Sequence, residues 1–370
     1  MPTFILTVLS VLALLLAVPA SAHELRPAVA TLTLTEAGLV LDLDLNLEAA
    51  LAGISAEHED TSLAPEAALY DSLRQLDPEA LEAELRAGDF EFMVLDVDGT
   101  AVQFQLDAVN VPPVGNLDVS RETILTLSAP QPAGRSAQMT WVAAGGPAIV
   151  VVDGPDGAPI HQEFLDAGAT SAPFDLTGAE RQGMGAVVWN YLVHGFEHII
   201  PKGLDHILFV VGLFLLSARL KPLLWQITAF TAAHTVTLAL GTLGLVEISP
   251  SIVEPLIALS ITWVCVENLI FREMRWWRPL IIFAFGLLHG LGFAGVLGDV
   301  GLSGEHFVAS LVAFNVGVEI GQLTVIAICF LAVGLWFRDK SWYRAAVVIP
   351  GSLIVGGIGF YWFLERTILA

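Results

Sequence analysis

Three histidines and two acids occur together in the stretch "HGFEHIIPKGLDH", which runs directly into an apolar segment. They are His194, Glu197, His198, Asp205 and His206. Further polar groups lie inside later apolar segments, at His234, Glu267, His289, Asn315 and Glu319. Histidine and carboxylate together are ligands typical of first-row transition metals, and at neutral pH they bind a dication without losing a proton. The residue types therefore predict a metal site.

Two arrangements of the first stretch are open. Offsets of four and eleven residues put His194, His198 and Asp205 on one face of a continuous helix, whereas Pro201 and Gly203 favour a break. The letters "HGFEH" also match H-x-x-E-H, the inverted zinc-protease pattern, in which two histidines bind zinc and the glutamate is the base. Three fixed positions are a weak signal for a protease.

Other residues have predicted supporting roles. Gly286 and Gly290, which lie on either side of His289 in the sequence, form a small-xxx-small pair. Such a pair predicts close helix packing, which would hold His289 against its neighbours. Asn315 is predicted to orient a ligand by a hydrogen bond. If cleavage follows Ala22, His23 becomes the N-terminal residue and offers an amine and a ring nitrogen to a metal such as copper.

The elements that must position these groups fall into four parts. Residues 1–22 are typical of a signal peptide, with an apolar run and then "PASA". Residues 23–182 predict an exported β-sandwich-like domain, because strands such as "LVLDLDLNL" alternate apolar and polar residues from Leu39 to Leu47. A small helical insertion, "PEAALYDSLRQLDPEALEAELRAG", is broken at Pro78. Residues 183–202 predict an interfacial linker helix.

Residues 203–370 predict an all-α membrane bundle of six helices. The mean hydropathy of the chain is +0.70, and only 15% of its residues are charged; apolar stretches of about twenty residues are long enough to cross a bilayer. The expected spans are 203–219, 222–244, 252–271, 279–298, 308–335 and 346–364.

Loop charges predict the orientation of these spans. Loops after the first, third and fifth spans contain basic residues, including Arg219, Arg278 and Arg338, whereas loops after the second and fourth contain only acids. Basic loops face the cytoplasm. We therefore expect a multi-pass protein of a bacterial inner (plasma) membrane, with the N-terminal domain and the C-terminus outside the cytoplasm.

The exported domain is strongly acidic. Residues 23–182 contain 27 Asp and Glu against 6 Lys and Arg, so they account for almost all of the net charge of −22. Binding to nucleic acid is excluded, because contacts with phosphates require the opposite sign of charge.

Several of these segments resemble the HupE/UreJ family of membrane proteins, in its branch with a large exported N-terminal domain. The resemblance is carried by "HIIPKGLDHILFVVGLFLLS", "FTAAHTVTLAL", "VENLIF" and "FGLLHGLGFAGVL", with "HELRP" and "LEAALAGI" in the exported domain. It implies uptake of nickel, sometimes cobalt, with His198, Asp205 and His206 as the recognition element and His234 and His289 along the pathway. The spacing of His198 to Asp205 and the long acidic domain depart from the compact permeases.

The leading hypothesis is a permease or binding protein for a divalent metal, with nickel, cobalt or zinc as the ion. His198, Asp205 and His206 would form an outer site, and Glu267 the inner exit. His234, His289 and Glu319 would form a separate midplane site. A membrane-embedded metallohydrolase is the second hypothesis; it predicts one tight cluster, whereas transport predicts ligands staggered in depth. The third is a membrane anchor whose exported domain binds an exported protein partner.

Overall fold

The structure, a computed structural model, describes residues 27–54, 61, 64–88, 90–115, 117, 120–142, 146–178, 183–246, 248–299 and 307–369. The expected signal peptide and His23 lie outside these residues. The chain divides into two compact units, a β-rich unit that continues to Asn190 and a helical unit that begins at Tyr191. Each unit is described by itself.

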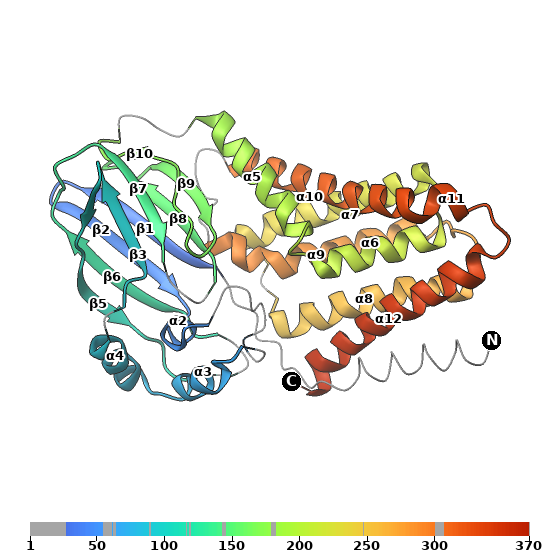
Figure 1. The fold of residues 1–370 in the computed structure, drawn as a ribbon, viewed down its shortest axis with the longest axis horizontal. Helices are drawn as coiled ribbons and strands as arrows, with labels where there is room; N and C mark the ends of the chain where they lie inside the picture. The colour runs from blue at the N-terminus through green and yellow to red at the C-terminus, as the bar shows by residue number, and fades with distance from the viewer. Residues whose placement is uncertain are drawn as a thin grey trace. The chain divides into compact units, whose positions relative to one another are not determined.

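The β-rich unit contains two sheets (Figure 1). The six-stranded sheet has the order β5 (Gln105–Asn110), β6 (Thr123–Ala129), β2 (Gly38–Leu45), β1 (Ala28–Thr35), β8 (Ala148–Asp153) and β9 (Pro159–Leu165). The four-stranded sheet has the order β10 (Phe174–Asp175), β7 (Ser136–Trp141), β3 (Met93–Val97) and β4 (Thr100–Val102). β1 pairs antiparallel with β2 and parallel with β8.

The alternating pattern in β2 produces the core as predicted. Leu39, Leu41 and Leu43 are each 1% exposed, and they share one hydrophobic core with residues of the other sheet such as Trp141. Leu47, predicted to extend this strand, instead begins helix α2 (Leu47–Ala52). The strand ends because the Asn46 side chain accepts a hydrogen bond from the backbone N–H of Ala49 and so caps the helix.

The predicted helical insertion is confirmed, and Figure 1 shows its helices near α2. Helix α3 spans Ala67–Arg74, and helix α4 spans Pro78–Ala87. Asp77 accepts a hydrogen bond from the Ala80 backbone at 2.9 Å, and Pro78 occupies the first turn, where its missing N–H leaves no bond unmade.

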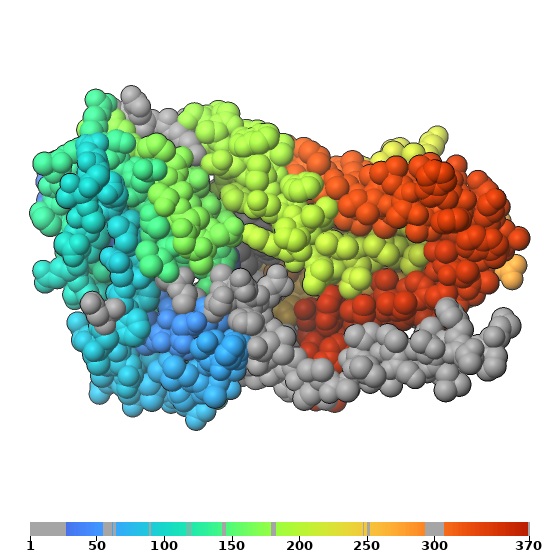
Figure 2. Space-filling view, in the orientation of Figure 1, coloured from blue at the N-terminus to red at the C-terminus, as the bar shows by residue number. Residues whose placement is uncertain are grey.

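The helical unit begins in α5 (Met184–Ile199) and continues through α6 (Leu204–Leu216), α7 (Leu220–Thr242), α8 (Pro250–Ile270), α9 (Arg278–Asp299) and α10 (Phe307–Cys329). The last segments are η2 (Phe330–Gly334), α11 (Leu335–Phe337), η3 (Arg344–Val348), α12 (Ile349–Leu364) and η4 (Glu365–Leu369). In Figure 2, the yellow-green surface of α6 lies between the orange-red surface of α10 and the red surface of α12, and α6 contacts both.

Four helical segments of the described chain are long and apolar enough to cross a membrane: Leu220–Thr242, Ile252–Ile270, Phe307–Phe337 and Arg344–Ile368. A fifth span results if α5 and α6, which are bent by 69° at their junction, count as one. The segment Arg278–Gly292 is apolar but shorter. The predicted count of six spans is therefore not confirmed, because the region predicted as 203–219 is a short helix after a bend and the described apolar part of the region predicted as 279–298 is too short to count.

Candidate metal centre

Three histidines from three helices meet inside the helical unit. His198 on α5, His206 on α6 and His234 on α7 each offer a ligand atom, and these atoms all lie within 4.8 Å of one another. His206 and His234 are 3% and 0% exposed. We call these three residues the histidine group. Among the described residues, it is the group of His, Cys, Asp or Glu side chains whose ligand atoms lie close enough together to hold a metal ion.

The break between α5 and α6 brings His198 to His206. The helices meet at 69°, and the two imidazole ring centroids lie 5.0 Å apart. A side chain at Gly203 would collide with the backbone carbonyl oxygen of His198, so this tight return requires glycine. Of the two arrangements left open by the sequence, the break is confirmed and the continuous helix is wrong.

Hydrogen bonds fix the orientation of two rings in the group. Asp205 Oδ1 accepts from His206 Nδ1 at 2.9 Å. Asn315 Oδ1 lies 3.1 Å from His234 Nδ1, and the Asn315 amide is itself oriented because its Nδ2 donates to the Leu311 carbonyl at 2.8 Å. Both partners are acceptors, so each Nδ1 carries the proton and each Nε2 presents a lone pair.

His289 on α9 stands beside the group. Its ring centroid lies 4.8 Å from that of His206, and its Nδ1 lies 2.9 Å from the Phe285 carbonyl oxygen, which can only accept. Among the described residues, the Nε2 atoms of His206, His234 and His289 have no hydrogen-bond partner and are buried. A buried polar atom left unpaired costs about 1–3 kcal/mol. Three such atoms close together indicate a ligand-binding arrangement better than they indicate packing.

Close helix packing places His289, as the sequence predicts. A side chain at Gly286 would meet the backbone carbonyl of Phe230, and one at Gly290 would meet the backbone carbonyl of His234. Helix α9 therefore lies directly against the backbone of α7. The small-xxx-small prediction is confirmed, and it explains how His289 reaches the other rings.

The structure corrects the predicted separation of an outer from a midplane site. His234 was predicted to lie deeper than His198 and His206, yet its ring centroid is 6.1 Å and 5.8 Å from theirs. The bend after α5 and the packing of α7 gather the histidines at one level. The transport hypothesis predicts metal ligands staggered in depth. A proposal of transport must therefore explain why the histidines lie together.

Three predicted residues lie outside the histidine group. His194 Nδ1 is 3.7 Å from Glu197 Oε2 on the same helix, so the two histidines of the H-x-x-E-H pattern do not converge on one point. Glu319 Oε1 accepts a hydrogen bond from the Thr228 hydroxyl at 2.7 Å, at a half-buried position. The predicted grouping of Glu319 with His234 is therefore not what the structure contains.

Glu267 lies in a different buried cluster. Its carboxylate Oε2 is 3.7 Å from Nη1 of Arg278, a residue that sequence reasoning assigned to a cytoplasmic loop. Arg278 is 1% exposed and begins α9. A signal was available, because a buried acid requires a positive partner and the loop after Glu267 contains the nearest arginines.

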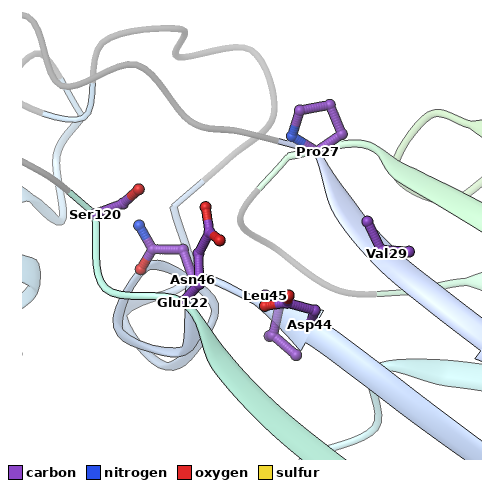
Figure 3. A pocket seen from close by; sticks show the side chains of 7 residues that line it. All are labelled: Pro27, Val29, Asp44, Leu45, Asn46, Ser120 and Glu122. Carbon is purple, nitrogen blue, oxygen red and sulfur yellow. The ribbon is translucent and has the colours of Figure 1, made fainter. Parts of the chain in front are cut away.

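The acidic β-rich unit offers a contrasting site. A small pocket where β1 and β6 begin and β2 ends is lined by Pro27, Val29, Asp44, Leu45, Asn46, Ser120 and Glu122 (Figure 3). It contains two carboxylates and no nitrogen ligand from histidine. The preferred ligands of a transition metal therefore lie in the helical unit.

One comparison with known proteins identifies the family of the helical unit. The family model described as "HupE / UreJ protein" matches residues 176–366, which cover the linker and the helical unit with all four clustered histidines. Neither the curated proteins nor the solved structures gave a significant match. Because the match covers more than half of the 370 residues, the chain belongs to the HupE/UreJ family.

Proposed function

We propose that this protein binds a divalent transition-metal ion at the histidine group and moves it across the membrane. Nickel or cobalt is the expected cargo, because the HupE/UreJ family is associated with transport of these metals. The single observation that carries the proposal is the set of buried Nε2 lone pairs on His206 and His234 of the group and on His289 beside it, each on a ring whose Nδ1 is already anchored.

The spacing of the group suits one ion after a small contraction. Two nitrogens bound to the same ion at about 2.1 Å lie no more than about 4.2 Å apart. The ligand atoms of His198, His206 and His234 are within 4.8 Å of one another, so the side chains need to close by roughly 1 Å or less. Nitrogen ligands with a nearby carboxylate favour nickel, cobalt or zinc over calcium or magnesium.

The gathering of the histidines at one level favours a single high-affinity binding step. It is also the arrangement expected of a membrane-embedded metallohydrolase, the alternative function. A hydrolase needs a general base beside the metal-bound water. Among the described residues, the carboxylate nearest the group belongs to Asp205, and it is occupied with His206, while Glu197 lies against His194. The site thus has ligands without a free base, which supports transport.

The proposed location is a bacterial plasma membrane, with the β-rich unit and the C-terminus on the outside. The loop charges support this orientation. Exposed tryptophans near the helix ends next to the basic loops support a membrane interface at that level, without indicating which side it is. Trp225, Trp276 and Trp336 are 68%, 87% and 65% exposed, and tryptophan is enriched at membrane interfaces. The exported domain is proposed to act outside the cytoplasm, with an exported protein as its partner.

The test compares histidines of the group with a neighbouring histidine outside it. Purified full-length protein is placed in lipid vesicles that enclose a metal-sensitive dye, and entry of Ni²⁺ or Co²⁺ is followed. His198→Ala and His206→Ala should lose metal entry, whereas His194→Ala, one turn from His198 but outside the group, should keep it. Equal entry in all three variants, at equal protein content, would refute the proposal. Hydrolysis of a test ester or peptide without metal entry would favour the alternative.

A further inference from the structure

A second buried polar cluster lies at another level of the helical unit. It consists of Glu267 and Asn268 on α8, Arg278 on α9 and Gln226 on α7, which are 3%, 0%, 1% and 1% exposed. Ionisable residues inside a membrane protein are costly and are usually functional. This cluster therefore needs an explanation of its own.

The guanidinium of Arg278 is held by amides rather than by the carboxylate. Its Nε donates to Gln226 Oε1 at 3.1 Å, and both Nη atoms donate to Asn268 Oδ1 at 3.4 Å. The Asn268 amide is fixed in turn, because its Nδ2 donates to the Gly212 carbonyl at 2.8 Å and to the Ser352 hydroxyl at 3.2 Å. The position of Arg278 therefore does not depend on its ion pair with Glu267.

Glu267 is consequently balanced in charge yet has unused acceptor capacity. Arg278 Nη1 is 3.7 Å from Oε2, which is within ion-pair distance but too long for a hydrogen bond. Both carboxylate oxygens of Glu267 are buried, and among the described residues the side chain contacts Arg278 through the ion pair and the Trp263 side chain one turn away through a weak polar contact. A carboxylate in this condition can accept a cation at the cost of one weak contact.

A layer of phenylalanines separates this cluster from the histidines. Residues three or four apart lie on the same face of a helix, and seven apart do so two turns away. The successive residues are His206, Phe209 and Gly212 on α6, His234, Phe230 and Gln226 on α7, and His289, Phe285 and Arg278 on α9. Phe209 lies 5.1 Å from Phe230 and 6.0 Å from Phe285 between ring centroids. The order on all three helices is histidine, phenylalanine, then a member of the polar cluster or, for Gly212, a hydrogen-bond partner of its Asn268.

We propose that Glu267 is a second, weaker site for the same divalent cation, on the far side of this phenylalanine layer. The proposal rests on the proposed function. Conduction requires sites that bind well enough to be entered and weakly enough to be left. The fixed positive charge of Arg278 next to Glu267 lowers the affinity for a dication by repulsion, so the cation leaves this site readily, whereas the uncharged histidines retain it.

The test counts metal ions with Co²⁺ as the probe, on purified full-length protein. The wild type should retain one Co²⁺, in the histidine group. Arg278→Gln removes the repelling charge and should raise the count to two, with the second ion showing the weaker visible absorption of oxygen ligands. The double variant Arg278→Gln with Glu267→Gln should return to one. A single Co²⁺ in Arg278→Gln overturns the inference.

A second variant decides the matter if Arg278→Gln does not accumulate in the membrane. Glu267→Gln should keep Co²⁺ in the histidine group and lose at least tenfold in the rate of Co²⁺ entry into vesicles. Glu254→Gln is the matched control, because Glu254 lies on the same helix and forms an ion pair of the same length, 3.7 Å, with Arg366. It should change neither quantity.

The two proposals fail in different ways. If the wild type binds no Co²⁺ that depends on His206, the proposed function is wrong. If that binding and metal entry are intact but Glu267→Gln enters metal at the wild-type rate, only the second site is wrong.

Discussion

Asp205 and His206 are adjacent in sequence and are joined twice. Asp205 Oδ1 accepts from the backbone N–H of His206 at 2.7 Å and from its ring Nδ1 at 2.9 Å. The carboxylate therefore fixes both the position and the tautomer of the ring. It is a positioning group for His206 in addition to a source of negative charge near the proposed metal site.

Substitution of Asp205 should separate these two roles. Asp205→Asn keeps an oxygen acceptor but loses the charge, and Asp205→Ala loses both. We expect the Kd for Co²⁺ to rise about tenfold to a hundredfold in Asp205→Ala, with Asp205→Asn in between. Titration with Co²⁺ on purified protein measures it. Identical affinities in the wild type and Asp205→Ala would show that the contact does not orient a ligand.

Two side chains of α10 should behave differently although they are one turn apart. Asn315→Leu removes the acceptor of His234 Nδ1, so the Kd for Co²⁺ should rise about tenfold to a hundredfold. Glu319→Gln should leave the Kd within about twofold, because Glu319 bonds to Thr228 and the amide oxygen can still accept that hydrogen bond. A larger loss in Glu319→Gln than in Asn315→Leu would contradict the assignment and restore Glu319 as a ligand.

Substitution of two neighbouring glycines should test the approach of α9 to α7. In Gly290→Ala the added carbon meets the backbone carbonyl of His234, which cannot move without shifting the helix. Gly292→Ala meets the end of the flexible Ile257 side chain, which can turn away. Metal binding should be lost in the first variant and kept in the second. Equal binding in the two, at equal amounts of folded protein, would count against the packing.

The β-rich unit should lose stability in acid through Asp175. Hydrogen bonds from Arg135 and then from Thr177 hold the pKa of Asp175 below its usual range. A lowered pKa in the folded state stabilises the protein above the unfolded value of about 3.9, and the contribution is lost as the pH falls towards the folded pKa. Asp175→Asn should therefore lower the Tm at pH 7, and the difference from wild type should narrow near pH 3.

Asp153 provides a control of opposite sign. Burial raises the pKa of Asp153, so its ionised form is unfavourable in the folded state at neutral pH. Asp153→Asn should leave the Tm at pH 7 unchanged or higher. Thermal unfolding of the full-length protein, followed by the circular dichroism of its sheets, measures both variants. A fall in Tm for Asp153→Asn as large as for Asp175→Asn would contradict the pKa argument.

The identity of the polar residues could be predicted from sequence, but their distances could not. His198, His206, His234 and His289 stand out because each is an ionisable group in or beside an apolar segment. Their gathering depends on the 69° bend after α5 and on the contact of α9 with α7. The spacing of residues along one helix predicts neither the bend nor the contact between helices. The sequence therefore suggested that the histidines lie at separate depths.

Elements whose signal lies in a few neighbouring residues were predictable, whereas contacts between residues distant in the sequence were not. Leucines in β2 alternate with a period of two, and Pro78 after Asp77 is a helix start that depends on a few neighbouring residues. Arg278 was misplaced in a loop because charge alone indicates a loop. Its burial depends on Gln226 and Asn268, which are 52 and 10 residues away.

The position of His198 ahead of the break has a practical consequence for dissecting the protein. A shortened chain that begins at Gly203 would retain all helices from α6 onward but would lack one of the three clustered histidines. A cut between the β-rich part and the helical part therefore belongs before Met184, where α5 begins. Epitope tags or fusion partners placed between Met184 and Gly203 would disturb the histidine group itself, whatever their effect on insertion into the bilayer.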